Sequence, residues 1–150
     1  MNNSPMCIIV TGRPGSGKTT LAGELSRRLW LPKLSRDEIK EGYVNTFGVK
    51  HDQLPPDTNG KVNEVFFETT LGLLKGDISL IIEAAFQHRL WSRIIPKIQQ
   101  IARTFIVICD LDAETSARRH LQRGLNDPNR EFFHGDRRVS IFRETGQFSP

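Results

Sequence analysis

Short apolar runs along the chain predict the strands of a sheet. Residues 6–11, 79–83 and 104–109 are rich in isoleucine and valine and are too short for buried helices. Such runs are apolar throughout when a strand belongs to a parallel sheet that is covered on both faces. A shorter strand is predicted at residues 33–35, after the break at Trp30-Leu31-Pro32.

Segments with helical periodicity separate these strands. The first helix is predicted from Thr20 onward, because leucines recur at a spacing of four at Leu21, Leu25 and Leu29. Ser35 with Glu38 three residues later forms a capping box, which predicts a short helix ending near Gly42. Residues 60–75, 88–103 and 112–123 are also predicted to be helical, with a long loop over residues 45–59. Gly124 is expected to end the last of these helices, and Pro96 to kink or divide the helix that contains it.

The alternation of strands and helices predicts an α/β fold with right-handed crossovers. We expect three layers, α/β/α, around a parallel sheet of about four strands. The length of 150 residues suits a single domain over residues 1–150. After Gly124 the chain is polar, and its only apolar anchors are Phe132, Phe133, Ile141 and Phe142.

The stretch from Gly12 to Thr19 reads G-R-P-G-S-G-K-T and fits G-x-x-x-x-G-K-[ST], the phosphate-binding P-loop. A predicted strand precedes it and a predicted helix follows, which is the context in which this motif binds nucleotides. Glycines let backbone N–H groups approach phosphate oxygens, and the helix N-terminus adds a positive dipole end. Lys18 is expected to reach the β- and γ-phosphates, and the Thr19 hydroxyl to bind Mg²⁺. The residues predicted to bind the nucleotide are Gly12, Pro14, Gly15, Ser16, Gly17, Lys18, Thr19 and Thr20.

Composition and charge limit the kinds of ligand and surroundings that are expected for this protein. The net charge of +4 and a pI of about 9.4 favour anionic ligands, but the charge is too dispersed to require nucleic acid. No apolar run approaches the ~20 residues that cross a bilayer, and residues 1–5 lack the features of a signal peptide. Cys7 and Cys109 each lie in an apolar run and are predicted to be free thiols, because they should lie at opposite edges of the sheet. A cytoplasmic protein without membrane contact is therefore expected.

Two carboxylates stand where α/β folds bind ligands. Asp37 lies just past the second predicted strand, where it could accept a hydroxyl proton during phosphoryl transfer. The helix dipole alone would also favour an aspartate in that first turn. Glu83 ends an apolar strand and is the best candidate for a group near Mg²⁺, with Asp110 ranked lower. Either carboxylate at a strand end could instead be solvated or paired.

Several arginines are candidates for contacts with phosphate. Arg119 and Arg123 lie four residues apart and share a helix face away from the apolar stripe, so a solvated basic face is the simple explanation. Arg36, Arg89 and Arg93 could help to hold an anionic acceptor, although surface charge explains each nearly as well. His134 and Asp136 are too few to predict a metal site.

The P-loop, together with Ser35-Arg36-Asp37 about seventeen residues beyond Lys18, resembles the small P-loop kinases of the AAA-type predicted-kinase group. Polynucleotide 5′-hydroxyl kinases, chloramphenicol phosphotransferase and zeta-toxin kinases are wider relatives. The resemblance covers residues 6–124. It implies that Asp37 is the general base and that Lys40, in place of the arginine of polynucleotide kinases, contacts substrate or phosphate. It also implies a lid over about residues 113–136, whose Arg119 and Arg123, with Arg130 as a further candidate, fold over the phosphates.

The resemblance and the residues together predict an ATP-dependent kinase with Mg²⁺ that phosphorylates a hydroxyl acceptor. A small molecule is favoured over a polynucleotide end, because no aromatic platform for bases is evident. The alternatives are a polynucleotide 5′-hydroxyl kinase and a nucleotide-binding ATPase or switch without an acceptor. Kinases of this shape normally have a fifth strand, which is not predicted here, so a catalytically incomplete form is a further alternative.

Overall fold

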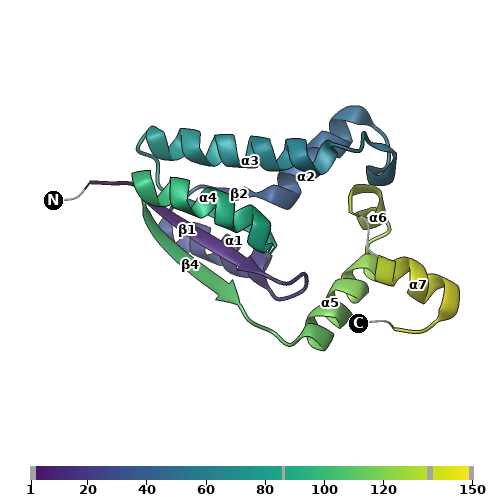
Figure 1. Ribbon diagram of the computed structural model, residues 1–150. Coiled ribbons are helices and arrows are strands. Elements are labelled where there is room, and N and C mark those ends of the chain that lie inside the picture. Colours follow the sequence, from purple (N-terminus) through teal and green to yellow (C-terminus); the bar gives the residue numbers. More distant parts are fainter. Residues whose placement is uncertain (1–2, 86, 135–136, 149–150) are drawn as a thin grey trace.

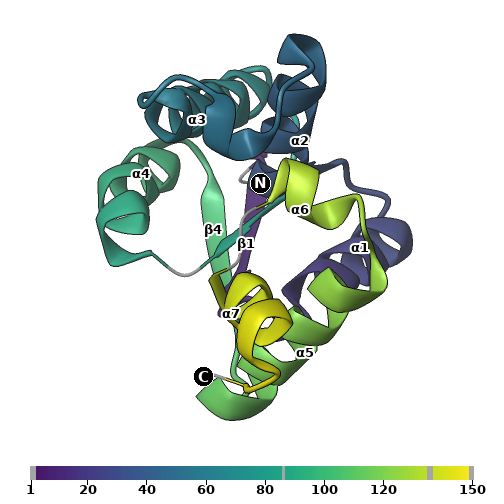
Figure 2. The same cartoon turned by 90° about the vertical axis from the view of Figure 1, so that its right-hand side faces the viewer.

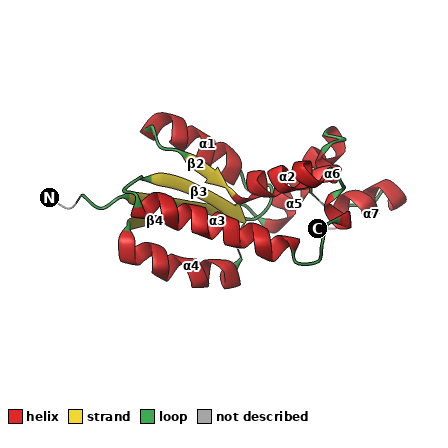
Figure 3. Cartoon of the chain, turned by 90° about the horizontal axis from the view of Figure 1, so that it is seen from above, coloured by secondary structure: helices red, strands yellow, loops and turns green. Residues whose placement is uncertain are grey.

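The computed structural model describes residues 3–85, 87–134 and 137–148. Its middle layer is a parallel sheet of four strands, as predicted, and the strand order is β2-β3-β1-β4. Helix α1 covers one face of the sheet, and helices α3 and α4 cover the other (Figures 1 and 3). The strands are β1 (Met6–Gly12), β2 (Lys33–Ser35), β3 (Leu80–Ala85) and β4 (Arg103–Cys109).

The helices follow the strands in the alternation that the sequence predicts. The two helices on the shared face, α3 and α4, lie beside each other, whereas α5, α6 and α7 lie beyond the carboxyl ends of the strands (Figure 1). The helices are α1 (Lys18–Leu29), α2 (Arg36–Phe47), the 3₁₀ turn η1 (His51–Gln53), α3 (Thr58–Lys75), α4 (His88–Ile101), α5 (Ala113–Asn126), α6 (Arg130–Phe133) and α7 (Arg137–Thr145). Within the described residues, none of these helices combines the length and apolarity needed to span a membrane.

Alternation along the central strands divides the core between the two faces. Ile8, Val10 and Ile81 pack against Ala22 on the α1 face, while the residues between them pack against α3 and α4. Each fully buried aliphatic side chain contributes about 1.5–3 kcal/mol. Because side chains repeat every two residues along a strand, Glu83 shares the α1 face with Ile81. This period directs Glu83 toward the start of α1.

Helix α2 is longer than the capping box alone predicts. It runs to Phe47 and not only to Gly42, because Val44 is fully buried and the rings of Tyr43 and Phe47 pack 4.7 Å apart. Gly48 then ends the helix in the left-handed region at φ 66°. The predicted loop over residues 45–59 is correspondingly shorter and contains η1.

The prediction that Gly124 ends α5 is wrong. The helix continues to Asn126, and Gly124 is buried against α7. A Cβ atom on Gly124 would lie 2.5 Å from Cγ2 of Val139, so glycine is required there by close packing and not by a turn. The chain beyond Asn126 folds into α6 and α7, and Pro96 lies inside α4 without dividing it.

The prediction that β4 is buried is also wrong. Phe105, Ile106 and Ile108 are each about half exposed, because β4 is an edge strand that pairs only with β1 among the described residues. Cys7 and Cys109 are both free, as predicted. Cys109 pairs with Gly12 in the register of β1 and β4, five residues along the strand from Cys7.

Candidate active site

The P-loop turns directly from β1 into α1. Gly15 and Gly17 have φ values of 83° and 91°, in the left-handed region that glycine adopts without strain. Gly17 is the N-cap residue, and α1 begins at Lys18 rather than at the predicted Thr20. The N-terminal end of α1, with its unpaired N–H groups and positive dipole end, is therefore at the loop. This geometry suits an anion such as a phosphate group.

Helix α5 lies directly against the P-loop. A Cβ atom on Gly15 would lie only 2.1 Å from the backbone oxygen of Ser116, which is buried in α5. Glycine at this position therefore allows two backbones to approach each other. This contact fixes the start of the predicted lid beside the phosphate-binding loop.

Lys18, Thr19 and Glu83 meet at the carboxyl edge of the sheet. The Thr19 hydroxyl donates a 2.7 Å hydrogen bond to Oε1 of Glu83, whose side chain is 1% exposed. Burial lowers the pKa of the Lys18 ammonium, and the carboxylates of Asp37 and Glu83 partly oppose this shift. The cation is thus buried beside two acids, in a site of mixed charge.

Two buried polar atoms in this region lack a hydrogen-bond partner among the described residues. They are Oε2 of Glu83 and Oγ of Ser16 in the P-loop. A buried polar atom without a partner is costly, so an unpaired carboxylate oxygen beside a threonine hydroxyl fits a hard cation such as Mg²⁺. The residues present therefore fit the Mg²⁺ and triphosphate that the P-loop implies. The described residues contain no cluster of three or more His, Cys, Asp or Glu side chains, and Asp136 lies outside them.

A cleft of about 320 Å³ extends from the P-loop to α2, and we call it the catalytic cleft. Asp37 lines it together with Lys18, and half of the Asp37 side chain is exposed. Ser35 caps α2 by accepting a hydrogen bond from the Glu38 N–H, so the predicted cap is confirmed and orients this first turn. The lining residues are Pro14, Lys18, Thr19, Ser35, Arg36, Asp37, Glu38, Lys40, Glu41, Ala85, Gln87, His120, Arg123, Arg130 and His134.

Arg36 is held in place by helix α3. Its Nε donates to Oδ1 of Asn63 at 2.7 Å, and its second terminal nitrogen donates to Oδ1 of Asn59 at 3.2 Å. The remaining nitrogen lies 3.8 Å from Oδ1 of Asp37. Lys40, one turn further along α2, has a pKa lowered by burial and by the charge of Arg36. Arg36 and Lys40 therefore both present positive charge near Asp37, and the two asparagines were not indicated by any sequence pattern.

The lid arginines divide into those that reach the cleft and those that do not. Arg123 lines it with its pKa lowered by burial and by Arg130, and Nδ1 of His120 lies 3.3 Å from its guanidinium. Arg130 also lines the cleft. Arg119, one turn earlier in α5, is exposed and is not among the lining residues, and neither is the exposed Thr20. Arg89 lies in a separate hollow on α4.

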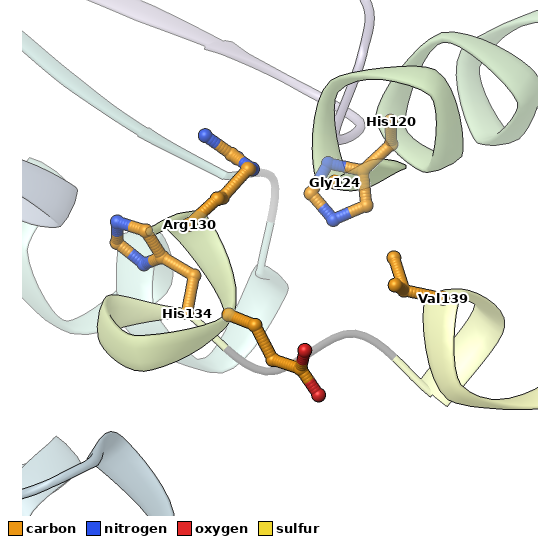
Figure 4. A pocket seen from close by; sticks show the side chains of 6 residues that line it. His120, Gly124, Arg130, His134 and Val139 are labelled. Carbon is orange, nitrogen blue, oxygen red and sulfur yellow. The ribbon is translucent and has the colours of Figure 1, made fainter. Parts of the chain in front are cut away.

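Helix α6 closes the far side of the cleft. It lies between α2 and α5 in Figure 2, and it contacts both helices. His134 Nε2 lies 2.7 Å from Oε1 of Glu41 on α2, while Lys50 Nζ lies 3.8 Å from Oε1 of Glu131. Figure 4 shows Arg130 of α6 and His134, which directly follows α6, around a small hollow that His120 and Gly124 of α5 and Val139 of α7 also line. Sequence reasoning missed His120 and Gln87, and it considered His134 only as half of a metal pair with Asp136, because no local pattern shows that these side chains line one cleft.

Comparisons with known proteins agree with this geometry. Residues 7–139 match the family model AAA_33, which is described as an AAA domain. A "putative kinase" from Chloroflexus aurantiacus j-10-fl is similar over 84% of this chain and 70% of its own, with 28% identity and a TM-score of 0.74. A chain of the Pnkp1/Rnl/Hen1 RNA repair complex has a TM-score of 0.72 and 19% identity over 97% of this chain, which spans 44% of that one.

A third similar fold belongs to shikimate kinase from Acinetobacter baumannii, solved with shikimate. Its TM-score is 0.59 and its identity 17%, over 95% of this chain and 80% of the shikimate kinase chain. Among curated proteins, none shows significant similarity to this chain. The family match covers most of the chain, and the similar structures include kinases. The chain therefore belongs to the AAA_33 family of P-loop kinase domains.

Proposed function

We propose that the protein is an ATP-dependent kinase that transfers the γ-phosphoryl group to a hydroxyl of a small-molecule acceptor. The observation that carries the proposal is the shared catalytic cleft, in which Asp37 on α2 and Lys18 of the P-loop line the same space. A P-loop alone supports nucleotide binding. A half-exposed carboxylate across the cleft from the phosphate site also supports an acceptor that loses its hydroxyl proton.

Each group in the cleft has a role in this reaction. Lys18 and the loop amides hold the phosphates, and Thr19 and Glu83 would hold Mg²⁺, which neutralises charge on the phosphate oxygens when bound. Asp37 orients the acceptor hydroxyl and accepts its proton. Arg123 and Arg130 stabilise the charge that develops during transfer, where guanidinium–phosphate hydrogen bonds are strongest. Arg119 could join them only if α5 moved, because it is outside the present lining.

The test pairs two variants in a coupled assay of ADP formation over a library of hydroxyl compounds. Lys18→Ala should abolish turnover and weaken nucleotide binding, because no other lysine lines the P-loop end of the cleft. Asp37→Asn should retain nucleotide affinity and lower transfer at least about 100-fold, as expected for loss of a general base. Asp37→Asn should cost no more than about 1 kcal/mol of stability, because asparagine retains a short polar side chain in the first turn.

A nucleotide-dependent switch or ATPase is the rival function. It would hydrolyse ATP as fast without an acceptor as with any hydroxyl compound, and Asp37→Asn would leave that rate near normal. Undiminished transfer by Asp37→Asn would likewise remove Asp37 as the base. Undiminished turnover by Lys18→Ala would contradict the P-loop assignment itself.

A further inference from the structure

Helix α4 presents a row of positive charge beside the catalytic cleft. Arg89, Arg93 and Lys97 lie four residues apart, so they share one side of the helix, and α4 contains no acidic residue. Leu90, Trp91, Ile94 and Ile98 are buried and hold the neighbouring side against the core. Neither Arg89 nor Arg93 has a carboxylate within salt-bridge distance among the residues that the structure describes. Arg89 in particular lines a hollow in which none of the described lining residues is acidic.

Arg89 and Arg93 line a hollow of about 390 Å³ next to the cleft, which we call the Arg89–Arg93 hollow. Its other lining residues are Asn63 of α3, Gln87, Leu90 and Ser92. Gln87 also lines the catalytic cleft, so the two spaces share a wall. Asn63 accepts the hydrogen bond that holds Arg36 beside Asp37. The hollow thus adjoins the acceptor side of the cleft and not the P-loop side.

The charge pattern limits where an anion would bind. A second hollow between α3 and α4 is lined by Arg93 and Lys97 together with Glu64 and Glu68, so its charges are balanced. Arg93 borders both hollows, whereas Arg89 lines only the first. Among the described residues that line the Arg89–Arg93 hollow, none is acidic. Two guanidiniums with an asparagine and a glutamine offer N–H donors that match the oxygens of a phosphate or carboxylate, while the Ser92 hydroxyl donates to the backbone oxygen of Arg89. Of the two hollows between α3 and α4, the Arg89–Arg93 hollow, which adjoins the Asp37 side of the cleft, is therefore the one that favours an anion.

We infer that the Arg89–Arg93 hollow binds an anionic group, a phosphate ester or a carboxylate, on the acceptor whose hydroxyl lies at Asp37. This inference rests on the proposed kinase function and specifies the substrate class as an anionic hydroxyl compound. Two fixed points, the hydroxyl at Asp37 and the anion at the arginines, would orient the acceptor for in-line transfer. The positive charge of Arg89 and Arg93 would also draw such acceptors toward the cleft.

The kinetic test uses pairs of acceptors that differ only in the anion. Glycerol is compared with glycerol 3-phosphate and with glycerate, and ribose with ribose 5-phosphate, as ratios of kcat/KM. The wild-type ratio should favour the anionic member at least tenfold. The double variant Arg89→Gln/Arg93→Gln should reduce that ratio by about ten- to a hundredfold, the loss expected for charged hydrogen bonds. Lys97→Gln is the matched control, because it removes a charge from the same helix face outside the hollow and should leave the ratio unchanged.

A binding experiment separates this inference from the kinase proposal. Inorganic phosphate is titrated into protein saturated with Mg²⁺ and a non-hydrolysable ATP analogue, so that the P-loop is already filled, and amide NMR signals are followed. Phosphate should shift the signals of Gln87 and Ser92 in the wild type and in Lys97→Gln, but not in the double variant. Failure of every hydroxyl compound as an acceptor, with these shifts present, would refute the kinase proposal and leave the anion site standing.

Other outcomes identify the anion or reject the site. A preference for the phosphate esters over glycerate selects phosphate, and the reverse selects carboxylate. A preference for an oligonucleotide 5′ end over every small ester would support the site and assign its anion to a polynucleotide backbone. Equal kcat/KM values for neutral and anionic acceptors, or a preference that the double variant retains, would overturn the inference while the kinase proposal stood.

Discussion

Glu83→Gln tests the predicted Mg²⁺ site in a way that separates metal binding from structural support. The glutamine keeps the shape of the side chain and still accepts the Thr19 hydrogen bond through its amide oxygen. It replaces the unpartnered Oε2 with an uncharged group. The change therefore removes a buried charge whose desolvation is costly, but also its attraction to Lys18. Because the two effects oppose each other, the free energy of unfolding without ligand should change by no more than about 1 kcal/mol.

When Mg²⁺ and nucleotide are bound, Glu83→Gln should change the free energy of unfolding by more than this, and the change should be a loss of stability. Loss of a charged contact to the metal or its water should raise the Kd of Mg²⁺–nucleotide about tenfold or more. At a ligand concentration of about 100 times the wild-type Kd, ligand stabilisation is about 2.7 kcal/mol, and a tenfold weaker Kd reduces it to about 1.4 kcal/mol. For a domain of 150 residues this loss corresponds to about 3–5 °C in Tm.

Thermal unfolding with a non-hydrolysable analogue measures this difference, with and without EDTA. The deficit of Glu83→Gln should disappear in EDTA, because the carboxylate acts through the metal. Thr19→Val is a companion variant that should show the same metal-dependent deficit. A lower Tm without ligand, combined with a normal Mg²⁺-dependent shift, would refute the reasoning and make Glu83 a structural residue.

Two further predictions concern the lid. Residues 117–134 should gain protection from hydrogen exchange when Mg²⁺ and a non-hydrolysable ATP analogue bind. Arg123→Ala should lower the rate of phosphoryl transfer more than it lowers nucleotide affinity. Unchanged exchange over this segment would remove the lid assignment. Gly124→Ala should destabilise the protein by about 1–3 kcal/mol, because the new Cβ would lie 2.5 Å from the Val139 side chain. Thermal melts should show that Gly124→Ala/Val139→Ala regains the stability lost in the single variant. A single variant as stable as wild type would show that the Val139 side chain can shift to make room for the new Cβ atom.

The features that the sequence alone determined are those encoded by neighbouring residues. The P-loop motif, the apolar strands and the Ser35 cap each depend on a few consecutive side chains, so the nucleotide-binding loop and the parallel α/β fold could be predicted. Glu83 was predicted because it was expected to end its strand at the ligand-binding edge of the sheet; β3 continues to Ala85, so Glu83 lies near that edge but inside the strand. Its bond to Thr19 follows from strand period and from the placement of α1.

The tertiary structure decided which side chains share a space. Gly124 has the residue type of a helix end, yet α5 continues because α7 packs against it, and only long-range contact could determine this. Residues far apart in sequence converge on the cleft for the same reason: Asn63 holds Arg36, and His134 bonds Glu41 from 93 residues away. Periodicity assigns a residue to a face of its own helix, but the packing of α3, α5 and α6 around the sheet determines what that face meets. Arg119 and Arg123 share such a face, and only Arg123 lines the cleft, because the contact of α5 with Gly15 of the P-loop decides which turn of α5 meets the cleft.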